Sequence, residues 1–222
     1  MTAIILPTKN ESESIRETIR RIRSVCSDRI VVVDGHSTDG TAKIARQMGA
    51  TVISDNGKGK GDALRVAFEY VDDDVVFVDV DDTYPVERIP EFIDALRDYD
   101  LVIGERTEFI AGSLPLLLRI GDWISRTAFL VLYGTRLDNL SGFRGITRDA
   151  ISQMKLESDG FGIETEITAK SVRLGLQIRK IPIAYSVREG DSKFNPIRDG
   201  IAVVCAMVRY RFSRGLSRRP VL

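Results

Sequence analysis

Three acidic residues directly follow an apolar run in the stretch VVFVDVDDTYP, residues 75–85. Side chains at positions i and i+2 of a strand share one face, so Asp79 and Asp81 would point the same way. Two carboxylates at that spacing suit a hard divalent cation such as Mg²⁺ or Mn²⁺, which prefers oxygen ligands. A structural alternative is open, because strands often end in acidic turn residues and Asp82 precedes Thr83. The rest of the sequence must decide between a metal site and a turn.

The elements that would position these acids alternate between strand and helix up to about residue 104. Apolar runs predict strands at 3–6, 29–34, 51–54, 74–80 and 100–104, and helical periodicity predicts helices at 10–25, 39–49, 61–71 and 85–98. Strands that are apolar throughout and alternate with helices are typical of a parallel sheet covered on both faces. The predicted fold class is therefore α/β.

Four of the predicted strands end in polar or glycine-rich sequence. These ends are PTKNE at 7–11, DGHSTDG at 34–40, DNGKGKGD at 55–62 and DVDD at 79–82. Ligands in parallel α/β folds bind beyond the carboxyl ends of the strands, so we expect the four ends to meet at one ligand. Taken singly, each end also reads as a helix cap or a turn. The glycine-lysine loop lacks the Lys-Ser/Thr ending of a P-loop, and PTKNE lacks the glycines of a dinucleotide fingerprint.

Composition and charge exclude several classes of function. The chain has 32 basic and 32 acidic residues and a formal net charge of +0, which predicts no nucleic-acid partner. Cys26 and Cys205 lack metal-ligand spacing, which predicts a reducing, cytosolic environment, and the N-terminal sequence lacks the pattern of a signal peptide. His36 is the only histidine, which excludes two-histidine metal sites and argues against a Ser/His/Asp triad.

The segment at 114–134 is apolar but carries too many charges for a comfortable transmembrane helix. Arg119, Asp122 and Arg126 stand at i, i+3 and i+7, so on a helix they would form one polar stripe on an otherwise apolar cylinder that includes Trp123. This pattern predicts a helix lying in the plane of a membrane interface. The alternative is a helix packed in the core with a salt-bridged edge.

The sequence changes character after residue 200. An apolar run at 201–208 is too short to span a membrane, and it leads into an arginine-rich tail that lacks acidic residues. We therefore predict one domain over residues 1–200 and an apolar, basic, membrane-associating tail at 201–222.

Seven motifs in order carry a likeness to a known family: PTKNE, VVDGHSTDGT, GKGKGDAL, DVDD, GER, SGFR and REGDSK. In these motifs the chain resembles family 2 glycosyltransferases with the GT-A fold, a mostly parallel Rossmann-like sheet flanked by helices. It is most similar to dolichyl-phosphate mannose or glucose synthases. The resemblance implies an inverting enzyme that transfers a hexose to dolichyl or another polyprenyl phosphate. The implied donor is GDP-mannose, with UDP-glucose as the alternative, and the implied place is the cytoplasmic face of a membrane, as a peripheral protein.

The resemblance also implies roles for individual residues. Nucleotide binding falls on Pro7, Thr8, Asn10, Glu11, Asp34, Lys60 and Asp79. Asp79 and Asp81 form a DxD motif for Mg²⁺ or Mn²⁺, and Thr83 stands where relatives often carry a further metal contact. The catalytic residues would be Asp81, Arg106 and Arg188. The acceptor phosphate would meet Arg106, Arg119, Arg126, Arg188 and Lys193.

The chemistry of the acceptor separates the remaining alternatives. A lipid phosphate is largely dianionic at neutral pH and is already a nucleophile, so it needs cations and no general base. A sugar hydroxyl, as in polysaccharide synthesis, would need a carboxylate to take its proton, and Glu164 or Glu166 is available. A nucleotidyltransferase and a nucleotide-binding subunit without enzymatic activity are the other readings.

Overall fold

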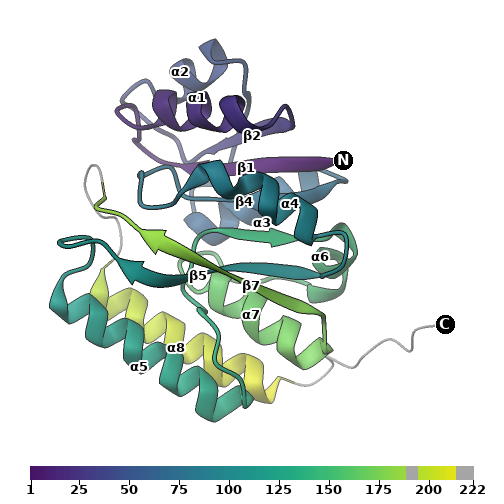
Figure 1. The fold of residues 1–222 in the computed structure, drawn as a ribbon, viewed down its shortest axis with the longest axis vertical. Coiled ribbons are helices and arrows are strands. Elements are labelled where there is room, and N and C mark those ends of the chain that lie inside the picture. The colour runs from purple at the N-terminus through teal and green to yellow at the C-terminus, as the bar shows by residue number, and fades with distance from the viewer. Residues whose placement is uncertain (189–194, 214–222) are drawn as a thin grey trace.

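A seven-stranded sheet forms the centre of this computed structural model, which describes residues 1–188 and 195–213 (Figure 1). The strands are β1 (Thr2–Thr8), β2 (Arg29–Asp34), β3 (Thr51–Ser54), β4 (Asp74–Phe77), β5 (Leu101–Phe109), β6 (Arg144–Ile146) and β7 (Ile178–Tyr185). Their order across the sheet is β3-β2-β1-β4-β6-β5-β7. Only β6 is reversed in this sheet, since it pairs antiparallel with both β4 and β5. The predicted mostly parallel α/β sheet is confirmed.

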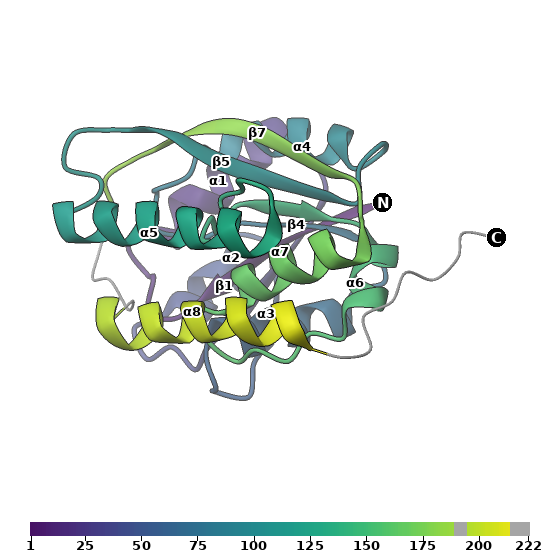
Figure 2. The same ribbon diagram turned by 90° about the horizontal axis from the view of Figure 1, so that it is seen from below.

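Helices cover both faces of the sheet (Figure 2). They are α1 (Ile15–Val25), α2 (Thr41–Gln47), α3 (Lys60–Tyr70), α4 (Ile89–Ala95) after the 3₁₀ turn η1 (Val86–Arg88), α5 (Leu116–Tyr133), α6 (Arg148–Met154), α7 (Ile163–Leu174) and α8 (Pro196–Phe212). One apolar cluster joins the sheet to α1, α2 and α4, and a second joins it to α3, α5, α6, α7 and α8. The molecule is therefore a three-layer α/β/α structure.

The alternation of side chains along β1 shows how the strands serve two cores. Ile4 and Leu6 pack on the side of α1, against residues such as Ile15, while Ile5 packs on the other side with Leu64 of α3. All of these side chains are fully buried. Burial of each large aliphatic side chain contributes about 1.5–3 kcal/mol. A strand that faces two apolar layers has no polar face, which explains the continuous apolar runs in the sequence.

Several element boundaries differ from those predicted. The strand expected at 74–80 ends at Phe77, because its neighbours β1 and β6 offer ladder partners only that far. Asp79 and Asp81 therefore lie in the loop beyond the strand, and the shared strand face that we inferred for them is wrong. The helix expected from residue 10 begins at Ile15, since Asn10 has a left-handed backbone (φ 52°).

Helix α5 turns its polar stripe toward the protein. Asp122 and Arg126 are buried, whereas Arg119 is exposed. The opposite, outward face is apolar, with Leu116, Trp123 and Val131 exposed by 73%, 60% and 79%. A surface helix normally places its apolar stripe inward, whereas α5 buries Asp122 and Arg126 beside the apolar Phe129.

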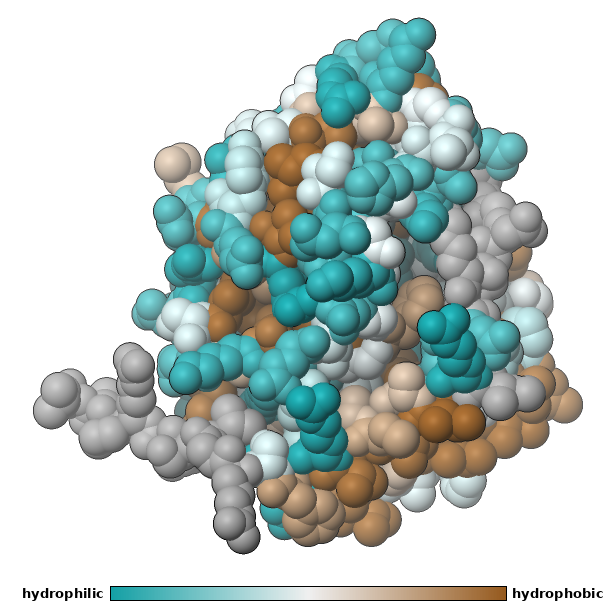
Figure 3. All heavy atoms as spheres, turned by 180° about the vertical axis from the view of Figure 1, so that it is seen from behind, coloured by the Kyte–Doolittle hydropathy of each residue, from teal (hydrophilic) through white to brown (hydrophobic). Residues whose placement is uncertain are grey.

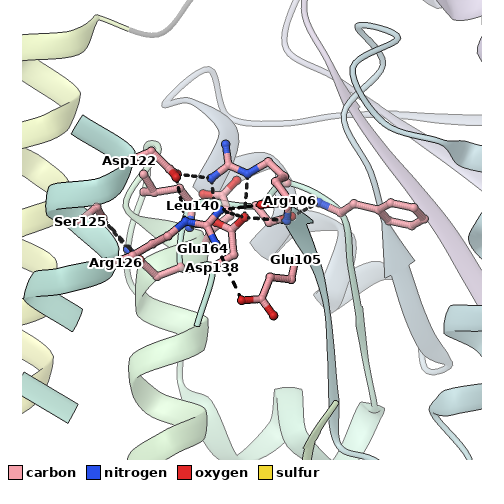
Figure 4. A network of polar contacts seen from close by, with 12 residues as sticks. Glu105, Arg106, Asp122, Ser125, Arg126, Asp138, Leu140 and Glu164 are labelled. Carbon is pink, nitrogen blue, oxygen red and sulfur yellow. Dashed lines mark hydrogen bonds and ion pairs between the residues drawn. The ribbon is translucent and has the colours of Figure 1, made fainter. Parts of the chain in front are cut away.

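A cluster of four buried charged residues holds α5 in this orientation (Figure 4). Arg106 of β5 donates from Nε to Asp138 Oδ2 at 2.7 Å and from Nη2 to Asp122 Oδ1 at 2.6 Å. Arg126 donates from Nε to Asp122 Oδ2 at 2.7 Å and from Nη2 to Asp138 Oδ2 at 2.6 Å. Each carboxylate thus bridges both guanidinium groups. We call these four residues the charge cluster.

The charge cluster shifts the pKa of one of its acids. Burial would raise the pKa of Asp138, but the attraction and hydrogen bonds of Arg106 and the charge of Arg126 outweigh it and lower the pKa to about 2. The carboxylate therefore stays ionised throughout the range in which the protein is expected to be folded.

Helix α8 lies alongside α5 and α7 and begins before the predicted domain boundary at residue 200. Tyr133 donates its hydroxyl to the Met207 carbonyl at 2.7 Å, and Arg211 donates from Nε to the Leu132 carbonyl at 2.7 Å. The outward face of α8 is again apolar, with Ile201, Val204, Val208 and Phe212 exposed. Apolar residues accordingly gather along the lower edge of the molecule in Figure 3, over α5 and α8. No helix in the described part of the chain combines the length and apolar character needed to cross a bilayer.

Removing one acid of the charge cluster tests how far it stabilises the fold. Asp138→Asn should lower the free energy of unfolding by about 3 kcal/mol at neutral pH, because two buried guanidinium groups lose a counter-charge. A carboxyl whose folded pKa is lowered stabilises above its unfolded pKa. The unsubstituted protein should therefore lose that stability as pH falls from about 4 toward 2, and the variant should lack this part of the loss. Urea unfolding at a series of pH values measures both effects.

The matched control is Asp94→Asn, which removes an exposed carboxylate paired with Arg97 at 3.2 Å. It should change the unfolding free energy by less than about 1 kcal/mol. Equal losses in the two variants would contradict the stabilising role of the charge cluster.

Candidate active site

A pocket of about 420 Å³ opens at the carboxyl ends of the central strands. It is lined by seven of the residues predicted from the sequence, namely Pro7, Thr8, Glu11, Lys60, Asp79, Asp81 and Arg188. They come from the ends of β1 and β4, the start of α3 and the segment after β7. The expectation that the strand ends meet at one site is borne out by this lining.

The loops at this edge are held in backbone conformations that L-residues adopt rarely. Asn10, His36 and Asp82 have positive φ values of 52°, 60° and 58°, and they follow β1, β2 and β4 respectively. Two hydrogen bonds connect the first two loops. The main-chain amide of Asn10 donates to Ser37 Oγ at 2.8 Å, and the main-chain amide of Thr38 donates to Asn10 Oδ1 at 2.9 Å. Residues in such conformations persist only where the surrounding contacts hold them in place, and they are common at functional sites.

The glycine-lysine loop is shaped by two aspartates. Asp55 accepts the Gly57 amide at 2.8 Å, and Asp62 accepts the Asn56 amide at 2.8 Å. A Cβ at Gly61 would lie 2.2 Å from the Ser158 carbonyl oxygen, so only glycine allows the start of α3 to approach that segment. These contacts place Lys60, the first residue of α3, at the pocket wall.

Lys60 bridges two acids. Its Nζ lies 2.5 Å from Asp79 Oδ1 and 2.6 Å from Glu164 Oε1, on the first turn of α7. Burial would lower the pKa of Lys60, but the two carboxylates outweigh burial and raise it. Burial raises the pKa of Asp79 to about 6 although Lys60 opposes the shift, and the neighbouring charges of Asp81 and Glu164 add to it. An additional positive charge near Asp79 would therefore stabilise the ionised form of this carboxylate.

Asp81 and Arg188 form a second pair in the pocket. Arg188 contacts Asp81 Oδ2 through Nη1, and its Nη2 lies 3.3 Å from Glu11 Oε1. Thr83 donates its hydroxyl to Asp81 Oδ1 at 2.5 Å from a fully buried position. Arg188 Nε is buried and has no hydrogen-bond partner within the described ranges. Two carboxylates thus share the Nη groups of Arg188, and its Nε–H is a donor that neither of them uses.

Other predicted site residues lie outside the pocket lining. Asp34 accepts the Ser37 amide at 3.2 Å and shapes the second loop, as Asn10 shapes the first. Thr83 orients Asp81, and its own contact with a metal stays a prediction. Arg119 is exposed on α5, and Lys193 lies outside the described residues.

Arg106 and Arg126 lie away from the pocket lining. Arg106 lies within β5, which runs on to Phe109, beyond the strand predicted at 100–104. Both guanidinium groups are satisfied by Asp122 and Asp138, and neither lines the pocket. We therefore do not include Arg106 and Arg126 among the residues that would bind the acceptor phosphate.

The two carboxylates considered as general bases are also committed elsewhere. Glu166 is fully buried, pairs with Lys170 at 2.6 Å and accepts the amides of Glu157 and Ser158. Glu164 is buried and pairs with Lys60. Neither belongs to the pocket lining.

The pocket contains residues that sequence reasoning did not select, namely Lys9, Asp55, Lys58, Phe161 and Arg198. Asp55 carries the same signal that identified its neighbours, because it is the first residue after β3. Arg198 carries no such signal, since it reaches the pocket from α8, far along the chain from the strand ends.

Three comparisons place the chain among known proteins. The model of glycosyl transferase family 2 matches residues 3–154. Glycosyltransferase AglJ of Haloferax volcanii is 37% identical over 217 residues, which cover 93% of this chain and 70% of that protein. A dolichyl-phosphate hexose transferase of the same organism is 34% identical over 212 residues, which cover 93% of this chain and 92% of that protein.

A solved structure extends the likeness to the fold. It is the glucosyl-3-phosphoglycerate synthase of Mycobacterium tuberculosis in complex with Mn²⁺, UDP and glucosyl-3-phosphoglycerate. It matches with a TM-score of 0.75 and 25% identity, over 95% of this chain and 79% of that one. The predicted GT-A fold is confirmed. With the family model matching residues 3–154 and the strand ends gathered at one pocket, the chain belongs to glycosyl transferase family 2.

Proposed function

We propose that this chain transfers a hexose from a nucleotide-sugar to the phosphate of dolichyl phosphate or another polyprenyl phosphate. The relative named dolichyl-phosphate hexose transferase supports this acceptor class. The observation that carries the proposal is that one pocket holds two carboxylates, Asp79 and Asp81, together with Arg188. The buried Nε of Arg188 has no hydrogen-bond partner among the described residues. The carboxylates suit a metal on the donor diphosphate, and the guanidinium suits the acceptor phosphate.

The donor nucleotide would lie across the ends of β1 and β4, where Pro7, Thr8, Glu11 and Lys60 line the pocket. The M. tuberculosis synthase, crystallised with UDP, supports a nucleoside diphosphate in a pocket of this fold. GDP-mannose is the favoured donor and UDP-glucose the alternative.

The acids of the pocket fit a Mg²⁺ or Mn²⁺ ion, the second of which is present in the M. tuberculosis complex. Asp79 already has a positive group, Lys60 Nζ, 2.5 Å from one oxygen. No group of three acidic, histidine or cysteine side chains in the described ranges is arranged to hold a metal. Such ions are commonly held by one or two carboxylates together with substrate phosphates, so Asp79 and Asp81 are sufficient. The ion would stabilise the negative charge of the departing nucleoside diphosphate.

Gly142 of the SGFR motif keeps the space around Asp79 open. A Cβ at this position would lie 2.2 Å from Asp79 Oδ2 and 2.9 Å from Lys60 Nζ. The Gly142 amide donates to the Tyr84 hydroxyl at 2.8 Å, which fixes the main chain there. The position of the Asp79 carboxylate therefore depends on the absence of a side chain at residue 142.

The acceptor phosphate needs no general base, because its dianion is already nucleophilic. One phosphate oxygen would attack the anomeric carbon while the bond to the nucleoside diphosphate breaks, with inversion at that carbon. Arg188, and Arg198 at the same pocket, would hold the phosphate. The rival acceptor, a sugar hydroxyl, would require Glu164 or Glu166 to leave an ion pair first.

The lipid tail would reach the pocket from the apolar face of α5 and α8. Ile120, Trp123 and Ile124 are exposed on α5, and Arg198 lies in the first turn of α8, the helix that presents Ile201 and Val204. Arg119 on α5 and Arg211 on α8 add exposed positive charge, which suits a bilayer with anionic lipids. We therefore propose that the protein docks peripherally on the cytoplasmic face of a membrane.

A donor screen tests the proposed reaction. Radiolabelled GDP-mannose and UDP-glucose are incubated with polyprenyl phosphate and Mg²⁺ or Mn²⁺, and label that partitions into organic solvent is counted. One donor should label the lipid, and EDTA or Asp81→Asn should lower the rate at least about a hundredfold, since charge on the leaving group is no longer stabilised. Asp149→Asn, an exposed acid on α6, is the control. Transfer that persists in EDTA would contradict the metal, and labelling of a water-soluble sugar would contradict the lipid acceptor.

Gly142→Ala tests the space around Asp79. The added Cβ would displace Asp79 or Lys60, so transfer should fall at least about tenfold while the fold and the far-ultraviolet circular dichroism are kept. The matched control is Gly121→Ala, because a Cβ at Gly121 meets no atom within 4 Å. Equal activity in the two variants would show that the site tolerates a side chain at residue 142.

Trp123→Glu tests the docking face. A charge in the middle of this face should cut binding to vesicles that contain anionic phospholipid at least about tenfold, while affinity for the nucleotide-sugar in calorimetry is unchanged. The control is Tyr70→Glu, at an aromatic residue of α3 that is exposed by 50% and lies on another part of the surface. Undiminished vesicle binding by the Trp123 variant would remove α5 from the membrane interface.

A further inference from the structure

The Asp79 carboxylate already has a cation on one of its oxygens. Oδ1 lies 2.5 Å from Lys60 Nζ. Oδ2 lies against the Gly142 main chain, so closely that an added Cβ there would be 2.2 Å away. A metal ion that binds Asp79 therefore competes with the Lys60 ammonium, because two cations on one carboxylate repel each other.

The displaced ammonium has a second partner. Lys60 Nζ lies 2.6 Å from Glu164 Oε1, and the Glu164 side chain is 4% exposed. Glu164 does not line the pocket, whereas Lys60 does. Glu164 is thus placed to retain Lys60 beside the pocket when the lysine leaves Asp79.

We propose that Lys60 exchanges with the divalent metal at Asp79 and that Glu164 is the positioning residue for this exchange. Without substrate, the lysine neutralises Asp79. When metal arrives with the nucleotide, Lys60 shifts away from Asp79 while Glu164 keeps it, and the ammonium then faces the donor diphosphate. This inference rests on the proposed function in one respect, that a divalent metal and a nucleoside diphosphate share the pocket.

The exchange predicts that metal and nucleotide bind cooperatively. Metal releases Lys60 toward the diphosphate, and the diphosphate supplies a new partner for the released ammonium, so each ligand lowers the cost of binding the other. Removing the lysine should strengthen the binding of metal alone and weaken this cooperativity.

Mn²⁺ binding, followed through the electron paramagnetic resonance signal of the free ion, provides the test without any turnover. It is measured with no nucleotide, with UDP and with GDP. Lys60→Met should bind Mn²⁺ alone at least about tenfold more tightly than the unsubstituted protein, because no ammonium has to leave. Either nucleotide should enhance Mn²⁺ binding less in this variant. Mn²⁺ affinity that is equal or lower in Lys60→Met without nucleotide would overturn the exchange.

Glu164 is tested by a double-mutant cycle. Glu164→Gln should weaken the binding of Mn²⁺ alone several-fold when Lys60 is present and should have little effect in the Lys60→Met background, because Glu164 acts through the lysine. The double variant also removes both charges of the buried pair and so avoids an unpaired buried acid. Equal weakening in the two backgrounds would show a direct effect on the metal and overturn the positioning role.

A buried lysine-glutamate pair of the same kind on α7 supplies the control. Lys170 Nζ lies 2.6 Å from Glu166 Oε1, away from the pocket lining, so Lys170→Met should leave Mn²⁺ affinity unchanged. Mn²⁺ binding that is the same in all variants would remove the exchange and leave the transferase proposal intact. Absence of Mn²⁺ binding in every variant, with either nucleotide, would remove the metal from the proposed function and the exchange with it.

Discussion

Four ion pairs join Arg106, Arg126, Asp122 and Asp138, and two of them, Arg106–Asp122 and Arg126–Asp138, attach α5 to β5 and to the loop after the helix. Phe129 is the fully buried apolar residue that α5 contributes to the core, and most of the other apolar side chains of this helix point outward. Ion pairs therefore add to the apolar contacts, which alone attach most surface helices to the core. The arrangement requires complete pairing, because a buried charge without its partner costs about 3–5 kcal/mol.

The same contacts lead to the active site through residues 138–144. The Asp138 carbonyl accepts Arg144 Nη2 at 3.0 Å, and the Ser141 carbonyl accepts Arg144 Nε at 2.7 Å. Arg144 is fully buried, and burial lowers its pKa to about 10. This guanidinium fixes the segment in which Gly142 lies beside Asp79. One short segment thus joins the helix that faces the proposed membrane to the carboxylate that faces the proposed metal.

The sequence predicted what depends on local pattern. Apolar runs located β1 to β5, and polar strand ends indicated the segments that contain Glu11, Lys60, Asp79 and Asp81, whereas Arg188 came from the family resemblance; all five line the pocket. It failed where partners are distant along the chain. The period of α5 predicted a polar stripe but not its direction, because Asp138, which draws the stripe inward, lies outside the helix. In the same way, no local pattern indicates that Glu164 pairs with Lys60, since α7 and α3 meet only in the folded protein.

The outward position of Trp123 has a spectroscopic consequence. It is the only tryptophan in the sequence, and it lies on α5 rather than in the core, exposed by 60%. Indole emission from this protein therefore comes from a single, largely hydrated ring on one helix. Its wavelength reports the polarity next to α5, and a change of environment at that face is readable without any attached label.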